Sequence, residues 1–154
     1  MTNELDSNIT TELESSIKIF NNWDELDLPQ NLLRGIYAYG FEKPSPIQSK
    51  AIYPLLQGHD LIAQAQSGTG KTGSFSIGAL SKIDTSKNTN QVIIMAPTHE
   101  LSQQITLVVK NLSSMMTGIR IKTIIGGSSI NEDADDMRKN VPHVILVVLE
   151  EFMI

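Results

Sequence analysis

A lysine and a threonine close a short glycine-bearing stretch, Ala65-Gln66-Ser67-Gly68-Thr69-Gly70-Lys71-Thr72. Its glycines let the backbone curl so that successive N–H groups point inward, where a phosphate group can accept hydrogen bonds from them. A helix that begins at the end of the stretch adds the positive end of its dipole. Lys71 can then reach the β- and γ-phosphates of a nucleotide, and the hydroxyl of Thr72 can ligate the magnesium ion that bridges them. The stretch therefore predicts a nucleotide site.

The usual phosphate-loop pattern begins with glycine, and this chain has Ala65 at that position. Alanine is tolerated there if its φ is negative. The alternative is a glycine-rich turn that ends in Lys-Thr by chance. An apolar run before the loop, Asp60-Leu61-Ile62-Ala63, and a helical pattern after Thr72 favour the phosphate loop, because such a loop joins a strand to a helix.

Apolar runs and helical patterns alternate along the rest of the chain. Strands that alternate with helices imply right-handed crossovers and a parallel sheet, with ligands at the carboxyl ends of the strands. The continuous apolar runs Val92–Met95 and Val144–Val148 are typical of strands buried on both faces of such a sheet. The pattern predicts an α/β fold with helices at 31–39, 46–56, 72–83, 100–116 and 131–139, and strands at 61–64, 92–95, 119–125 and 144–148.

Composition excludes several classes of site. The 154 residues suit one domain, and 40% hydrophobic with 19% charged residues is ordinary for a globular protein. There is no cysteine for disulfides or thiolate metal sites, and His59, His99 and His143 are too scattered for a ligand set. The metal we expect is Mg²⁺ carried with nucleotide. The N-terminus is acidic, and no apolar run approaches the length of a membrane span, so we expect a cytoplasmic or nuclear monomer with no membrane partner.

The net charge of −5 bears on nucleic-acid binding. A protein that binds nucleic acid through its overall field is usually basic, so any RNA contact here must be local. A nucleotide-binding module with no nucleic-acid partner is therefore an alternative.

Four motifs occur in the order and spacing of the DEAD-box ATP-dependent RNA helicases. They are Gly40-Phe41-x-x-Pro44-x-x-Ile47-Gln48, the phosphate loop, Ala96-Pro97-Thr98-x-Glu100-Leu101-x-x-Gln104, and Gly126-Gly127. The chain resembles this family, and within it the translation-initiation type, from about Phe20 to Leu146. The resemblance implies an incomplete RecA-like (P-loop NTPase) domain, with a parallel sheet flanked by helices, that binds ATP and Mg²⁺.

The resemblance also implies a cap that recognises the base. Gln48 would read adenine, because its amide offers a donor and an acceptor to the N6 and N7 edge, and Phe41 would lie against the purine ring. Lys43 belongs to the same segment, and Trp23 resembles the upstream aromatic that supports the cap. For Phe41 and Trp23 the alternative is packing in the hydrophobic core.

RNA contacts are implied at two further motifs. Pro97, Thr98 and His99, with Gly126 and Gly127, resemble the family's contacts to the RNA backbone, which hold RNA without reading its sequence. Alone, the glycine pair also suits a plain turn. His99 departs from the family, which has an arginine there, and neutral imidazole lacks arginine's permanent forked charge. We therefore expect weaker RNA contact at this strand.

The two ends of the chain differ from the middle. Residues 1–19 read as a disordered acidic tail, residues 20–148 as the N-terminal part of the first RecA-like domain, and residues 149–154 as a divergent tail. The family continues after the last strand with Thr-Pro-Gly-Arg and later Asp-Glu-Ala-Asp, which the 154 residues lack. A shift of reading frame near Val147 would explain the divergence; the alternative is a natural short paralogue.

These observations predict the ATP-binding part of an RNA helicase that holds ATP without turning it over alone. We also expect a marginal or partly molten fold, since the strand at 61–64 would lack its neighbours. An initiation-complex scaffold protein is a further expected partner. The alternative function is a non-catalytic regulator that binds RNA or a helicase partner.

Overall fold

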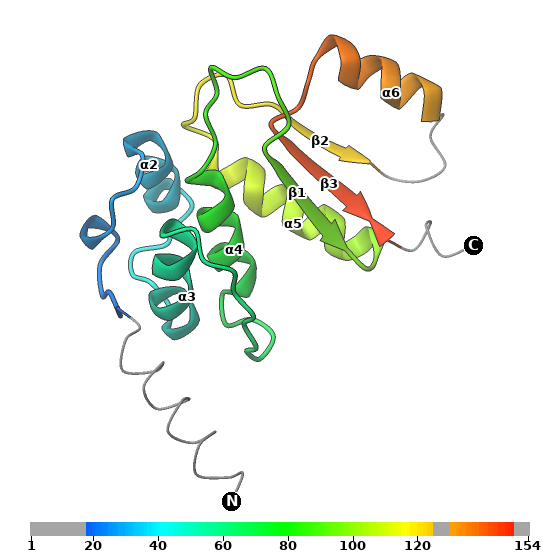
Figure 1. The fold of residues 1–154 in the computed structure, drawn as a ribbon. Helices are drawn as coiled ribbons and strands as arrows, with labels where there is room; N and C mark the ends of the chain where they lie inside the picture. The colour runs from blue at the N-terminus through cyan, green and yellow to red at the C-terminus, as the bar shows by residue number, and fades with distance from the viewer. Residues whose placement is uncertain (1–17, 125–129, 150–154) are drawn as a thin grey trace, which may run out of the picture.

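The computed structural model describes residues 18–124 and 130–149. Helices and strands alternate along the second half of the chain, after a helical first half (Figure 1). The elements are the 3₁₀ helix η1 (Trp23–Glu25), α2 (Gln30–Ala38), α3 (Pro46–Leu56), α4 (Lys71–Leu80), β1 (Val92–Ala96), α5 (His99–Leu112), β2 (Ile121–Ile124), α6 (Ile130–Lys139) and β3 (Val144–Val148).

Three strands form a parallel sheet within the described residues, in the order β1-β3-β2. Val144 at the start of β3 pairs with Val92 of β1 and with Ile121 of β2. The predicted α/β fold with a parallel sheet is confirmed. Parallel neighbours place the carboxyl ends of β1, β2 and β3 at one edge of the sheet, where ligands of such folds bind.

Helix α5 covers one face of this sheet (Figure 1). Its inner side chains Ile105, Val109 and Leu112 share one hydrophobic cluster with Ile94 of β1 and Leu146 of β3. On the other face, Ile93 is 61% exposed and Met95 is 63% exposed. The prediction that β1 is buried on both faces is therefore wrong, because within the described residues α5 covers one face of β1 and no helix covers the other.

Helices α2, α3 and α4 form the layer beside the sheet (Figure 1). Ser45 caps α3: its side chain accepts a hydrogen bond from the backbone N–H of Gln48 at 3.4 Å, and Pro46 occupies the first turn. Phe20 and Trp23 are fully buried and join the cluster that runs through α2 and α5. These two aromatic side chains thus belong to the hydrophobic core of the helical layer.

No strand forms at Leu61–Gln64, and this prediction is also wrong. Leu61 is 40% exposed and Ile62 is 101% exposed. A strand needs a neighbour for its backbone N–H and C=O groups, and within the described residues no strand pairs with this segment. The chain runs into the phosphate loop without regular structure.

The remaining predicted elements exist, with ends shifted by a few residues. The helix predicted to reach residue 83 ends at Leu80, and the one predicted to reach residue 116 ends at Leu112, where Ser113 caps it. The pair Gly126-Gly127, most of the predicted N-terminal tail and residues 150–154 lie outside the described residues. Among the helices that the structure describes, none has the length and hydropathy of a membrane span.

Candidate nucleotide-binding site

The phosphate loop enters α4 through Gly70. This residue is the N-cap of α4 and has φ 102°, a left-handed conformation that favours glycine. No side chain caps the helix, and its first turn contains no acidic residue. The first N–H groups of an α-helix have no partner within the helix, so those of α4 are available to an anion. This start of α4 fits the phosphate that the sequence predicted.

Lys71 folds back over the loop that precedes it. Its ammonium group donates to the backbone oxygens of Ala65 and Gln66, the second at 2.7 Å. Thr69 donates its hydroxyl to the same Gln66 oxygen at 2.7 Å. The loop thus curls around a cation, and a phosphate would supply the oxygens that the two carbonyls now provide. Thr72 follows on the first turn of α4, half-buried beside Lys71.

Gln48 connects the predicted base cap to the phosphate loop. Its side chain is 2% exposed; its Oε1 accepts from the backbone N–H of Ser45 at 2.8 Å, and its Nε2 donates to the Gly70 oxygen at 3.3 Å. A primary amide keeps one further N–H and one further lone pair. Gln48 therefore lies beside the phosphate loop, and part of its hydrogen-bonding capacity serves the protein itself.

Phe41 is held by two aromatic neighbours. Its ring stacks on Trp23 with centroids 6.4 Å apart and meets Tyr39 edge-on at 4.7 Å. Trp23 also donates its indole N–H to the Phe41 backbone oxygen at 2.8 Å. Because Trp23 is fully buried, it belongs to the core and does not reach a ligand; it positions Phe41. Phe41 itself is half-buried and keeps an open side.

A pocket of about 460 Å³ joins the phosphate loop to this cap. It brings together six of the predicted residues: Phe41, Ser67, Gly68, Gly70, Lys71 and Thr72. Gln48, Ala65, Gln66 and Thr69 support its wall without lining it. Lys43 instead lines a separate hollow of about 440 Å³ with Phe20 and Asn22.

Sequence reasoning assigned no role to other residues that line the 460 Å³ pocket. Tyr39 comes from the end of α2, Gly73 from the first turn of α4, and Leu101, Gln104 and Val108 from α5. An i, i+3, i+7 spacing places the last three on one face of a helix, which was readable from the sequence. Whether this face meets the phosphate loop depends on how α5 packs. That contact could not be predicted from the sequence.

A second hollow, of about 420 Å³, is also lined by Lys71 and Thr72. Its walls are mostly apolar, from α3, α4, α5 and the segment around Leu61 and Ala63. Apolar walls do not compensate a desolvated phosphate, whereas the larger pocket offers the glycine loop. The 460 Å³ pocket is therefore the better candidate for a nucleotide.

Of the predicted RNA contacts, Pro97, Thr98 and His99 lie at the carboxyl end of β1, and Gly126 and Gly127 lie outside the described residues. Pro97 and Thr98 are exposed and His99 is half-buried at the start of α5. The Thr98 hydroxyl accepts from the N–H of Leu101 at 3.2 Å and so caps α5. Since a hydroxyl has two lone pairs and a proton, Thr98 keeps its O–H for a phosphate oxygen.

The chain matches the model of a known protein family. The family model described as DEAD/DEAH box helicase matches residues 45–154, more than half of the chain. The chain belongs to this helicase family. It is 52% identical over 121 residues to the ATP-dependent RNA helicase eIF4A of Saccharomyces cerevisiae, a match that covers 79% of this chain and 30% of the relative. The eIF4A of Eremothecium gossypii is 48% identical over 145 residues, covering 94% of this chain and 36% of the relative.

Solved helicase structures share the fold. A DEAD box protein from Methanococcus jannaschii superposes with a TM-score of 0.77 at 31% identity, covering 84% of this chain and 35% of that one. The RNA helicase Prp28 from Chaetomium thermophilum, bound to ADP, gives 0.75 at 34% identity, covering 90% and 34%. The chain thus has the fold of DEAD-box RecA-like domains and spans about a third of the length of the relatives it matches.

Proposed function

We propose that this chain is the ATP-binding part of an RNA helicase of the eIF4A type, and that it binds ATP with Mg²⁺ and the backbone of RNA. One observation carries the nucleotide part: the same pocket is lined by Lys71, by Thr72 in the uncapped first turn of α4, and by Phe41. The similar helicase Prp28 is bound to ADP, which supports the same ligand class here.

Different residues would bind the phosphates, the metal ion and the base of the nucleotide. The N–H groups of the first turn of α4 and the ammonium of Lys71 would hold the phosphates, and the Thr72 hydroxyl would ligate Mg²⁺. Phe41 would lie against the purine ring, and Gln48 would offer its remaining N–H and lone pair to the adenine edge. The protein lines this pocket with a single lysine, Lys71, as a positive charge for the phosphates. Magnesium would neutralise further negative charge on the phosphates.

Titration of the chain with a non-hydrolysable ATP analogue and Mg²⁺ tests this proposal. We expect saturable binding that Lys71→Ala removes and Lys50→Ala leaves unchanged. Lys50 is a matched control, because it is an exposed lysine on the neighbouring helix α3. Binding that survives Lys71→Ala, or no binding by a chain whose circular dichroism shows the expected helix content, would refute the proposal.

The RNA part rests on the exposed Thr98, which follows β1 and accepts a hydrogen bond from Leu101, a residue that lines the nucleotide pocket. Backbone contacts should give affinity that is independent of base sequence and falls as salt rises. We expect Thr98→Ala to weaken binding of a single-stranded oligonucleotide and Gln103→Ala, on an exposed position of α5, to leave it unchanged. Equal affinity of all three chains would refute the RNA contact.

The partner, location and oligomeric state remain proposals of the same kind. A helicase of this type would work in the cytoplasm, as a monomer, with an initiation-complex scaffold protein as a partner. Sedimentation of the purified chain would test the monomer, and localisation of a tagged chain would test its place in the cytoplasm.

A further inference from the structure

We propose that the 420 Å³ hollow beside the phosphate loop binds an alkyl carboxylate, an anion with one small head and an aliphatic tail, and that this ligand excludes ATP from Lys71. The nucleotide proposed above occupies the 460 Å³ pocket, which leaves this hollow open for another ligand. Binding of the carboxylate is independent of the proposed nucleotide function, and only the exclusion of ATP rests on that function.

Three helices give the hollow an apolar wall. Leu55 comes from α3, Phe75 from α4 and Ile105 from α5, while Leu61 and Ala63 line it from the irregular segment before the phosphate loop. Leu61 is 40% exposed and Phe75 is 36% exposed, so both side chains still contact water. An alkyl tail that covers them would be stabilised by the hydrophobic effect. The volume also lies within the usual range of small-ligand sites.

The polar groups of the hollow lie at the first turn of α4. They belong to Lys71, Thr72 and Ser74. The ammonium of Lys71 has three N–H donors and gives two of them to the backbone oxygens of Ala65 and Gln66, so one donor is left. The Thr72 hydroxyl has no hydrogen-bond partner among the described residues. Lys71 and Thr72 can therefore both donate to one carboxylate at this end of the hollow.

This separation of polar and apolar lining selects the ligand class. A carboxylate in apolar surroundings is costly unless a cation pairs with it, and Lys71 supplies that cation. The charges of a polyphosphate are spread along its length and would meet the apolar wall. An alkyl alcohol would cover the same wall but would form no ion pair with Lys71. The lining thus fits an aliphatic tail with a single anionic head.

Lys71 and Thr72 line the nucleotide pocket as well as the hollow. A carboxylate bound to both would occupy the groups proposed for the phosphates and for Mg²⁺. The two ligands would therefore exclude each other, and free alkyl carboxylate would act as a competitive regulator of the nucleotide site.

Calorimetric titration of the whole chain with sodium hexanoate, octanoate and decanoate, each below its micelle concentration, tests the site. Each further methylene should raise the affinity about two- to fourfold, as expected when a CH₂ group is buried. Lys71→Met keeps the apolar stem and removes the charge. We expect it to weaken decanoate binding about tenfold, the effect of one lost charged hydrogen bond, and to leave decanol within about twofold.

A matched pair of variants locates the ligand. Ala63 lines the hollow, so the ring of Ala63→Phe would occupy part of the space for the tail. The neighbouring Ile62 is 101% exposed and does not line the hollow, which makes Ile62→Phe the control. Both positions are exposed in a segment without regular structure, so both variants should keep the circular dichroism of wild type. We expect Ala63→Phe to abolish decanoate binding and Ile62→Phe to match wild type.

Four results would count against the inference. No decanoate binding by a chain with the expected helix content would overturn it. Equal affinities in Ala63→Phe and Ile62→Phe would place the ligand elsewhere. Equal losses of decanoate and decanol in Lys71→Met would refute the contact to the carboxylate. In wild type, decanoate should raise the apparent dissociation constant of the ATP analogue, and an unchanged constant would refute the exclusion.

Failure of the nucleotide function has a different signature. A chain that binds decanoate, with the expected response to Ala63→Phe, but binds no ATP analogue would refute the proposed nucleotide function and support the carboxylate site.

Discussion

The indole N–H of Trp23 donates to the backbone oxygen of Phe41 at 2.8 Å, across 18 residues of sequence. The two rings also stack, with an interplanar angle of 20°. One fully buried residue thereby fixes both the backbone and the ring of a residue that lines the candidate nucleotide pocket. The hydrophobic core and the site are joined at this contact.

Trp23→Phe should therefore lower both stability and ATP affinity. The variant keeps an aromatic ring but leaves the Phe41 oxygen without its donor, which costs about 1–3 kcal/mol of unfolding free energy. We expect ATP affinity to fall several-fold, measured beside urea unfolding. Phe20→Leu is the control: Phe20 is also fully buried, 5.8 Å from Trp23, and does not line the pocket. The same affinity loss in Phe20→Leu would show a general effect of stability instead.

A second prediction concerns His143, which is fully buried where β3 begins. Its Nδ1 accepts from the N–H of Arg120 at 3.0 Å, so Nε2 carries the proton and donates to the Lys87 oxygen at 3.0 Å. His143→Leu removes both bonds and should cost about 2–4 kcal/mol by urea unfolding. His143→Asn should cost less, because its side-chain oxygen can still accept from Arg120. Equal losses would mean that packing, not hydrogen bonding, gives His143 its role.

The open face of β1 gives a third prediction, from two neighbouring isoleucines. Ile93 is 61% exposed and Ile94 is 9% exposed. Ile94→Ala should lower the unfolding free energy by about 2–4 kcal/mol, since it leaves a cavity against α5. Ile93→Ala should change it by about 0.5 kcal/mol. Similar losses at both positions would show that the second face of β1 is also covered in solution.

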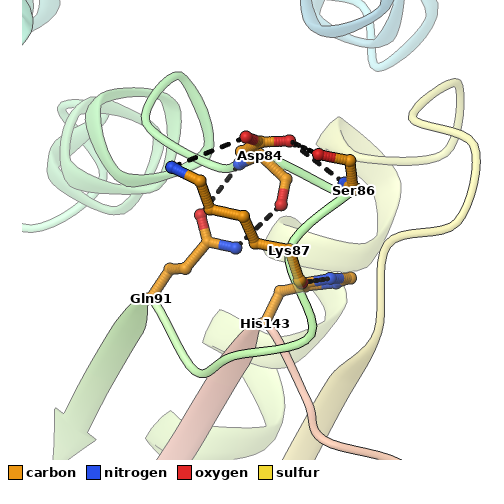
Figure 2. Close-up of polar contacts among 5 residues, drawn as sticks. All are labelled: Asp84, Ser86, Lys87, Gln91 and His143. Atoms are coloured by element: carbon orange, nitrogen blue, oxygen red, sulfur yellow. Dashed lines mark hydrogen bonds and ion pairs between the residues drawn. The ribbon is translucent and has the colours of Figure 1, made fainter.

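The loop before β1 gives a prediction about pH. Figure 2 shows Asp84 among Ser86, Lys87 and Gln91. Hydrogen bonds from the Ser86 hydroxyl, at 2.6 Å, and from its N–H, with the nearby Lys87 ammonium, lower the pKa of Asp84 below its usual 3.8. A lowered pKa stabilises the folded loop above the unfolded value, and this contribution is lost as pH falls through the folded pKa.

An NMR titration of the Asp84 carboxyl carbon measures this directly. Ser86→Ala should raise the pKa of Asp84, and Lys87→Met should raise it less, because the serine hydrogen bonds are the larger cause. A larger shift in Lys87→Met than in Ser86→Ala would contradict this order.

The sequence by itself determined the elements that follow local rules. Glycine spacing placed the phosphate loop, Ser45 and Pro46 placed the start of α3, and continuous apolar runs placed β1 and β3, because caps, turns and hydrophobic periodicity act within a few residues. The motif series also predicted the helicase family, since four motifs in register specify a family more strongly than any one of them.

Tertiary structure alone decided which of these residues meet. The apolar segment at 61–64 is not a strand, because a strand depends on a neighbour that its own sequence does not encode. The exposure of Ile93 depends on which helices cover the sheet, and the apolar pattern of β1 is the same for one covered face or two. The approach of Phe41 and Gln48 to Gly73 joins three separate segments of the chain. Such contacts follow from packing, which depends on the whole fold and cannot be read from residue types and spacing.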